Sequence, residues 1–252
     1  MKYTGERVIP EEEFCGPKTN IYKEHVARYQ FASKYTKSKK VLDVACGSGY
    51  GSEILSESGA DYVIGCDISK ESIEYAQKHY QKDNIKFVTN DIKKLNFNDE
   101  EFDCVISFET LEHIKDQKLV ISELKRVLKK DGILIISTPN LESRTNSEEN
   151  SNCFHEKELT VIEFKELLTE YFPKFDLFSQ RLIIEINLCK KFIRDLILKS
   201  VKWDSKKIYT KIFPQKFYNS VYNVIDDTDG DYQPISYNSA QKPRILIGVC
   251  YK

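Results

Sequence analysis

The sequence has no run of apolar residues long enough to cross a membrane. Its apolar stretches have the length of a β-strand, such as ILIIS at 133–137, whereas a membrane-spanning helix needs about 20 residues. Residues 1–14, MKYTGERVIPEEEF, also lack the apolar core of a signal peptide. We therefore predict a cytoplasmic protein without a membrane span.

Glycine and proline are few, with 10 and 7 residues among 252, which excludes collagen-like and low-complexity chains. Hydrophobic residues make up 40% and charged residues 31%, so the chain is not a disordered one. This length is typical of one large α/β domain, or of one domain with an inserted cap.

No charge of one sign dominates, since 38 Lys and Arg residues face 39 Asp and Glu residues. Proteins that bind nucleic acid nonspecifically usually carry a basic excess, so the composition argues against that partner. The seven cysteines are odd in number and contain no C-x-x-C pair. This pattern indicates neither a disulfide framework nor a cysteine-rich zinc site. It favours a protein of the reducing cytosol.

From residue 40 onward, apolar strand-like runs alternate with amphipathic helices, which is typical of a parallel sheet covered on both faces. The predicted strands are KVLDVAC (40–46), DYVIGCD (61–67), IKFVTND (85–91), FDCVISFE (102–109), GILIISTP (132–139), FDLFSQRLIIEI (175–186) and PRILIGVCYK (243–252). The predicted helices cover 52–58, 70–80, 158–168 and a segment that carries Val120, Leu124, Val127 and Leu128 on one face.

Two segments lie outside this pattern. Residues 1–36 form an N-terminal arm, irregular at first and then helical over 21–36. Residues 37–186 and 236–252 form the core, and 187–235 interrupts it before the last strand. This basic and aromatic insertion could stack on nucleic acid. We favour a helical cap or an oligomerisation segment whose aromatic side chains pack inward, and with it a homodimer.

A glycine-rich loop, VLDVACGSGYG, follows the first predicted strand. Gly47 and Gly49 allow a tight turn and a close approach of the backbone to a ligand at the start of the next helix. The dinucleotide fingerprint G-x-G-x-x-G requires a third glycine at 52, but that residue is serine. Asp43, just before the loop, suits a cation better than a pyrophosphate.

Carboxylates also end the next two predicted strands. Asp67 can accept hydrogen bonds from both hydroxyls of a ribose, and Asp91 lies at the same edge, where open α/β sheets bind ligands. Each aspartate by itself could be a helix cap or a turn residue. Together, beside a glycine loop, Asp43, Asp67 and Asp91 favour a cationic ligand that carries a ribose.

The chain resembles a class I S-adenosylmethionine-dependent methyltransferase. VLDVACGSGYG, GCDIS, NDI, FDCVISFETLEHI and LKKDGILIISTPN match the motifs of that superfamily in order. The resemblance implies an α/β fold with a seven-stranded, mostly parallel, doubly wound sheet whose last strand is antiparallel. It implies S-adenosylmethionine as the cofactor, with Asp67 on the ribose, Asp91 and Ile92 at the adenine, and Asp43 supporting the loop and the amino group. The remaining implied cofactor residues are Cys46, Gly47, Gly49, Ile68 and Phe108.

Residues after the fourth predicted strand suggest how a methyl acceptor is activated. If a helix begins there, Glu109, Glu112 and His113 share one face, and His155 follows the fifth strand. A sugar hydroxyl needs a base or a metal to become nucleophilic. Glu109, Glu112, His113 and His155 form a candidate site for Mn, Fe, Zn or Mg, with Glu112 and His113 as candidate catalytic residues.

This E-x-x-E-H group resembles those of small-RNA 2′-O-methyltransferases and ubiquinone-pathway O-methyltransferases. The RNA enzymes also carry a later histidine after a T-P-N turn, as Thr138-Pro139-Asn140 and His155 do here. The alternative is a metal-free enzyme, in which Glu112 braces the site, His113 acts as a base or packs, and His155 caps a helix. The sequence lacks the [DNS]-P-P-[YF] motif and the Pro-Cys nucleophile of two classes of DNA methyltransferase.

The N-terminal arm, with TGERVIP and HVARYQFA, resembles that of bacterial methyltransferases that occur with glycosyltransferases. This resemblance implies a lid through which Arg7, Tyr22 or His25 reaches the ligands, although these side chains could equally pack the arm onto the core. We predict a methyltransferase that O-methylates a sugar hydroxyl of a glycan, nucleotide-sugar or glycosylated metabolite. The alternatives are a metal-free small-molecule N- or O-methyltransferase, an RNA 2′-O-methyltransferase, a non-catalytic cofactor-binding subunit and, last, a dehydrogenase.

Overall fold

The computed structural model describes residues 9–10, 19–143, 154–180, 232–238 and 243–252. All of these except Tyr232 belong to one compact unit, made of residues 1–181 and 233–252. Arg7, residues 181–186 and most of the predicted cap lie outside the described residues, so the predicted domain boundaries stay a prediction. Among the residues that are described, no helix has both the length and the apolar character needed to cross a bilayer.

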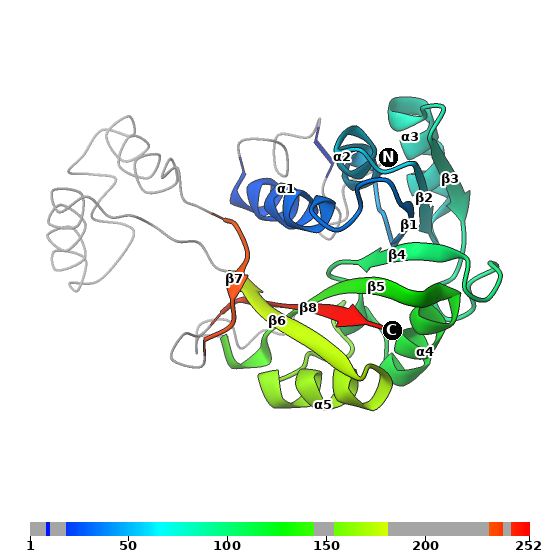
Figure 1. The fold of residues 1–252 in the computed structure, drawn as a ribbon. Coiled ribbons are helices and arrows are strands. Elements are labelled where there is room, and N and C mark those ends of the chain that lie inside the picture. Colours follow the sequence, from blue (N-terminus) through cyan, green and yellow to red (C-terminus); the bar gives the residue numbers. More distant parts are fainter. Residues whose placement is uncertain (1–8, 11–18, 144–153, 181–231, 239–242) are drawn as a thin grey trace, which may run out of the picture. The chain divides into compact units, whose positions relative to one another are not determined.

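The core of this unit is a sheet with the strand order β3-β2-β1-β4-β5-β8-β6-β7 (Figure 1). The pairs among the first five strands in this order are parallel, and β8 runs antiparallel to both β5 and β6. The strands are β1 (Lys40–Val44), β2 (Tyr62–Asp67), β3 (Ile85–Thr89), β4 (Phe102–Ser107), β5 (Leu128–Pro139), β6 (Lys174–Gln180), β7 (Ile235–Ser236) and β8 (Ile245–Tyr251). The predicted fold class and the antiparallel last strand are confirmed.

The predicted strand count was wrong by one. The additional strand, β7, consists of Ile235 and Ser236, which pair with Ser179 and Phe178 of β6. Two residues cannot show the alternation of apolar and polar side chains from which a strand is predicted. This strand forms because β6 offers an open edge to a segment that is distant in sequence.

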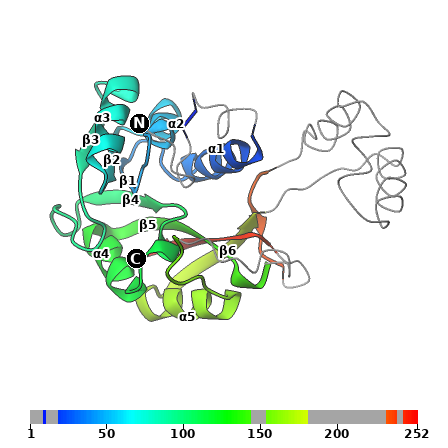
Figure 2. The same ribbon diagram turned by 180° about the vertical axis from the view of Figure 1, so that it is seen from behind.

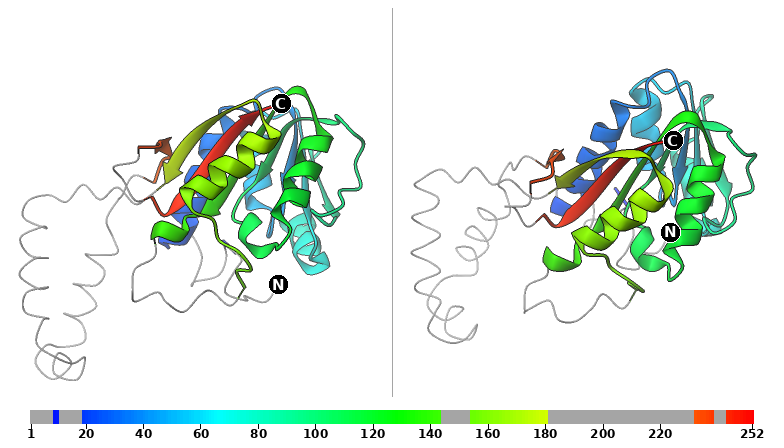
Figure 3. Two further views of the ribbon diagram at one scale, coloured as in Figure 1. Left: turned by 90° about the horizontal axis from the view of Figure 1, so that it is seen from below. Right: turned by 60° about the horizontal axis from the view of Figure 1, so that its bottom comes forward.

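Helices cover both faces of the sheet, as predicted. One face carries α1 (Asn20–Ser33), α2 (Tyr50–Glu57) and α3 (Lys70–Tyr80), and the other carries α4 (Gln117–Val127) and α5 (Val161–Tyr171) (Figures 2 and 3). Helix α3 has the predicted bounds. Helix α5 begins later than predicted because Thr160 and Glu163 form a capping box there. Leu128, predicted on a helix, instead opens β5.

Helix α1 packs on α2 through Tyr29, a contact that depends on Gly51. A Cβ atom on Gly51 would lie only 2.0 Å from Cζ of the Tyr29 ring. The glycine that falls outside the dinucleotide fingerprint therefore lets two helices approach. This contact brings α1 over the loop that follows β1 and so positions the site.

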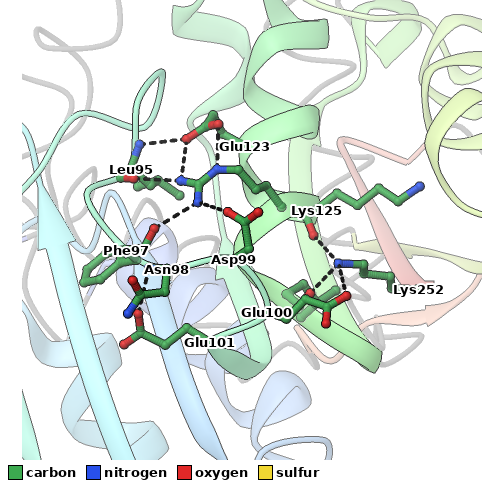
Figure 4. Close-up of polar contacts among 11 residues, drawn as sticks. Leu95, Phe97, Asn98, Asp99, Glu100, Glu101, Glu123, Lys125 and Lys252 are labelled. Atoms are coloured by element: carbon green, nitrogen blue, oxygen red, sulfur yellow. Dashed lines mark hydrogen bonds and ion pairs between the residues drawn. The ribbon is translucent and has the colours of Figure 1, made fainter.

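One arginine, Arg126, holds the connection from β3 to β4, and Figure 4 labels its partners Leu95, Phe97, Asp99 and Glu123. Arg126 donates hydrogen bonds to Glu123 and Asp99, and also to the carbonyl oxygens of Leu95 and Phe97. Glu123 in turn accepts from the N–H of Leu95 at 2.9 Å. These bonds anchor the connection to α4.

Candidate functional site

A cavity of about 430 Å³ lies at the carboxyl ends of β1, β2, β3 and β4. Seven of the nine predicted cofactor residues line it, namely Cys46, Gly47, Asp67, Ile68, Asp91, Ile92 and Phe108. His25, Glu109 and His113 also line it. Side chains predicted separately for the cofactor and for the acceptor therefore share one cavity.

The loop after β1 owes its shape to backbone with positive φ. Ala45, Gly47 and Gly49 have φ values of 60°, 56° and 92°, a region that most residues with a side chain avoid. A Cβ on Gly47 would meet no atom within 4 Å, whereas one on Gly49 would lie 2.6 Å from Cβ of Ala76. Gly47 leaves space at the cavity, and Gly49 allows α3 to pack under the loop.

Asp67 is largely buried at the end of β2, and its carboxylate binds the backbone of two separate segments. Its Oδ2 accepts from the N–H of Gly47 at 3.0 Å, and its Oδ1 accepts from the N–H of Ser69 at 2.8 Å. One carboxylate thus ties the glycine loop to the start of α3. It lines the cavity where the resemblance places a ribose.

Asp43 does not line the cavity but lies fully buried behind the loop. It accepts hydrogen bonds from the hydroxyl of Ser52 at 2.7 Å and from that of Tyr29 at 3.1 Å. Burial raises the pKa of Asp43 to about 7, although both hydroxyls act in the opposite direction. The Asp43 side chain therefore joins α1, α2 and β1. Its predicted contact with the amino group of the cofactor stays a prediction.

The acceptor side departs from the predicted geometry. Only a single 3₁₀ turn, η1 (Leu111–His113), follows β4, and Glu109 precedes it with a φ of 47°. The Glu109 N–H donates to Oγ of Ser137 at 3.2 Å, and that hydroxyl donates to Oε1 of Glu109 at 2.7 Å. The shared helical face expected for Glu109, Glu112 and His113 is therefore wrong.

Glu112, His113 and His155 nevertheless converge. Each offers one potential ligand atom, and these atoms lie within 4.8 Å of one another. Glu109, the fourth predicted ligand, is not part of this group. The segment after β5 is brought back to η1 by the carbonyl oxygen of Glu112, which accepts from the N–H groups of Glu156 and Lys157 at 2.8 and 3.0 Å.

The two histidines are oriented by hydrogen bonds at Nδ1. His113 bonds the carbonyl oxygen of Phe154 at 3.0 Å, and His155 bonds a carboxylate oxygen of Glu158. A neutral imidazole that donates from Nδ1 carries its lone pair on Nε2, which is the form that binds a metal. Histidine ligands of metals usually have such carbonyl or carboxylate partners.

Glu112 is almost fully buried, with 1% of its surface exposed. Burial, and then the nearby Glu109, raises its pKa well above the usual range. A cation bound beside Glu112 would favour its charged form. The environment of this carboxyl thus suits a site in which cation binding and proton release are coupled.

The predicted lid residues are placed differently. His25 lines the cavity, and burial together with Arg28 lowers its pKa well below the ordinary value. Tyr22 instead packs against Tyr50, with 5.6 Å between ring centroids. Sequence reasoning missed Tyr29, Tyr50 and Phe154, which also line the cavity. For Phe154, its position next to His155 was the available signal.

Residues 42–136 match the family model of a methyltransferase domain. A probable S-adenosylmethionine-dependent methyltransferase of Mycolicibacterium smegmatis is 31% identical over 172 residues, which are 67% of this chain and 63% of that protein. The chain belongs to the class I S-adenosylmethionine-dependent methyltransferase superfamily. S-adenosylmethionine is the cofactor of this superfamily.

Two further matches involve a shorter region or a lower identity. The ubiquinone biosynthesis O-methyltransferase of Pelagibacter ubique is 36% identical over 124 residues, covering 49% of this chain and 50% of that protein. The crystal structure of an S-adenosylmethionine-dependent methyltransferase from Archaeoglobus fulgidus has a TM-score of 0.61 at 17% identity, with 96% of this chain and 97% of that one covered. This chain thus spans less than two thirds of the two curated relatives, and the solved structure shows the shared fold alone.

Proposed function

We propose that this protein is an S-adenosylmethionine-dependent O-methyltransferase whose acceptor oxygen belongs to a sugar hydroxyl. The main support for this proposal is that the glycine loop, Asp67 and His113 line one cavity. His113 also belongs to the cluster with Glu112 and His155. One part is suited to hold a ribose-bearing cofactor, and the other to activate a weak nucleophile.

The residues present fit the cofactor. Gly47 faces open space, Asp67 lines the cavity with an ionisable carboxylate, and Ile68 and Ile92 offer apolar surface beside Asp91. When bound, S-adenosylmethionine supplies a methyl group on a positively charged sulfur. The chain's own contribution is to hold the acceptor in line with that methyl and to exclude water, for which Tyr29, Tyr50 and Phe108 supply a wall of aromatic rings.

The cluster of Glu112, His113 and His155 fits a divalent metal of the Mn, Fe or Zn type. A mixed carboxylate and imidazole donor set suits these ions, and Mg less well. A metal there would lower the pKa of a bound hydroxyl group. In this proposal His113 and His155 bind through Nε2, Phe154 and Glu158 hold the rings in place, and Glu112 supplies the charge.

Metal-free catalysis is the second candidate, and the hydrogen bond of His113 favours it. Because Nδ1 bonds the Phe154 carbonyl, Nε2 is the basic atom, and His113 lines the cavity. His113 would then accept the proton of the acceptor hydroxyl directly. An amine acceptor would also suit this arrangement, since it needs less activation.

Calorimetric titration with S-adenosylhomocysteine, with and without EDTA, followed by metal analysis of the purified protein, tests the proposal. We expect binding in both conditions, one divalent ion per chain, and loss of that ion in Glu112→Ala and His155→Ala. His79→Ala is the matched control, because His79 stacks on Tyr75 of α3, outside the cluster. Binding without a metal would favour the second candidate, and no binding would refute both.

Methyl transfer from labelled cofactor then identifies the acceptor class. We expect transfer to sugars and nucleotide-sugars, and none to RNA oligonucleotides, amines or dihydroxybenzoates. Transfer to a dihydroxybenzoate would instead show a phenol acceptor and would contradict the proposed sugar acceptor. The homodimer predicted for residues 187–235 is a separate proposal, which light scattering of the purified protein tests.

A further inference from the structure

Glu109 lies at the cavity in a backbone conformation that most residues avoid. It lines the cavity but does not belong to the group of potential metal ligands formed by Glu112, His113 and His155. Its φ of 47° falls in the left-handed region, where a glutamate is strained and a glycine is not. Strain of this kind is found mainly at functional sites, so it points to a function for the Glu109 side chain.

A buried serine holds the carboxylate of Glu109 in place. Ser137, which has no exposed surface, accepts from the Glu109 N–H at 3.2 Å and donates to Oε1 of Glu109 at 2.7 Å. Within the described part of the chain, this is the only hydrogen bond that the carboxylate accepts. A carboxylate can accept several hydrogen bonds, so Glu109 keeps acceptor positions for a ligand in the cavity.

An aromatic residue, Phe154, lines the same cavity and has 46% of its surface exposed. A large apolar side chain exposed at a cavity is typical of a binding surface. Its carbonyl oxygen bonds Nδ1 of His113 at 3.0 Å, which fixes the backbone of Phe154 to the turn after β4. Glu109 precedes that same turn. The carboxylate, the imidazole and the aromatic residue thus come from two segments that this hydrogen bond joins.

We propose that Glu109 and Phe154 form the subsite that recognises the sugar ring of the acceptor. The Glu109 carboxylate accepts hydrogen bonds from ring hydroxyls beside the one that is methylated, and Phe154 packs against the apolar C–H face of the ring. A neutral sugar ring fits both residues, whereas an acid group next to those hydroxyls is repelled by Glu109. This inference rests on the proposed function and adds the residues that select the sugar.

NMR titration of the protein saturated with S-adenosylhomocysteine tests this subsite. The probes are the methyl glycosides of glucose, galactose, mannose and rhamnose, with glucuronate and galacturonate as acidic references. We expect a neutral glycoside to bind best, and Glu109→Gln to weaken its binding roughly 10-fold because a charged acceptor is lost.

The aromatic half of the subsite is tested in the same titration. Phe154→Ala should weaken binding of the neutral glycoside roughly 3- to 10-fold. Phe154→Tyr keeps an aromatic ring and should bind as the unaltered protein does. The matched controls are Glu142→Gln and Ile162→Ala, which change exposed side chains outside this cavity and should have no effect.

Stability and metal content separate this role of Glu109 from others. Glu109→Gly relieves the backbone strain, so it should unfold at the same temperature or higher while it loses glycoside binding as Glu109→Gln does. A lower melting temperature with unchanged glycoside binding would show a structural role and overturn the inference. Loss of a bound divalent ion in Glu109→Gln would make Glu109 a metal ligand, which also overturns it.

The remaining outcomes distinguish this inference from the proposed function. If the unaltered protein binds a neutral glycoside and Glu109→Gln and Phe154→Ala bind it equally well, the inference fails and the proposed function stands. Tighter binding of a uronate than of any neutral glycoside would overturn the inference in the same way. Binding of S-adenosylhomocysteine without binding of any sugar would instead refute the proposed sugar acceptor.

Discussion

The two sides of the cavity are built in different ways. Apart from Phe108, the cofactor side comes from one stretch, residues 44–92, in which Asp67 ends β2 and Asp91 lies just after β3. The acceptor side combines His25 of α1, the turn at 109–113 and the segment 154–158. A site made from one stretch can be described by a motif, whereas a site made from three depends on how the chain folds back on itself.

The buried carboxyl groups of the two sides also differ in their surroundings. Asp67 accepts hydrogen bonds from the backbone N–H groups of Gly47 and Ser69, so both of its oxygens have a partner within the protein. Glu112 is buried beside Glu109, and its pKa is raised. The carboxylate of the cofactor side thus has its hydrogen-bond partners without a ligand. The acceptor side, with two carboxyl groups close together, is electrostatically suited to a cation.

The largest expected effect on stability and cofactor binding comes from a substitution that disrupts only the cofactor side. Gly49→Ala adds a Cβ only 2.6 Å from that of Ala76, at a φ of 92°. We expect it to reduce the free energy of unfolding by about 2–4 kcal/mol and to abolish binding of S-adenosylhomocysteine. Gly47→Ala meets no atom within 4 Å and should cost about 1 kcal/mol. Urea denaturation measures both, and equal losses would contradict this account of the loop.

A second prediction concerns the pH dependence of stability. The pKa of Asp43 is about 7 in the folded protein and about 4 in an unfolded chain. The folded state therefore binds the additional proton, so the contribution of Asp43 to stability is present below pH 4 and is lost as the pH rises to 7. Asp43→Asn should remove this decline, by up to about 1.4 kcal/mol per pH unit. Urea denaturation from pH 4 to pH 8 would contradict the prediction if both proteins gave parallel curves.

A third prediction changes the acceptor side alone. Glu158→Gln weakens the support of His155, so metal affinity should fall roughly 10- to 100-fold while binding of S-adenosylhomocysteine stays the same. Glu156→Gln is the matched control, since Glu156 is an exposed side chain two residues away. Competition with a chelating dye measures the affinity. A loss of cofactor binding in Glu158→Gln would show that the two sides are not independent.

The smallest effect on the site is expected for a residue that belongs to neither side. Arg126→Lys loses the paired donors that hold the β3–β4 connection (Figure 4). It should reduce the free energy of unfolding by about 1 kcal/mol, because the network is partly exposed. Thermal denaturation and S-adenosylhomocysteine titration should show lower stability with unchanged affinity. Reduced affinity would mean that the connection helps to position Asp91.

Much of the fold could be predicted because its signals are local. Apolar runs indicated all seven longer strands, and the helix predicted over 70–80 corresponds to α3 with its observed bounds. The turn after β4 could not be predicted in this way. Its E-x-x-E-H spacing has a helical period, but Glu109 adopts a positive φ and bonds Ser137 of the neighbouring strand, which ends any helix there.

The sequence by itself determined the parallel sheet, the glycine loop and the aspartates at the strand ends, because each depends on residues adjacent in the chain. Only the tertiary structure decided which side chains meet. It placed Asp43 behind the loop, left Glu109 out of the cluster of Glu112 and His155, and buried Arg28 against Gln180. The physical reason is that these contacts join residues as far as 152 positions apart, and no local spacing encodes such a distance.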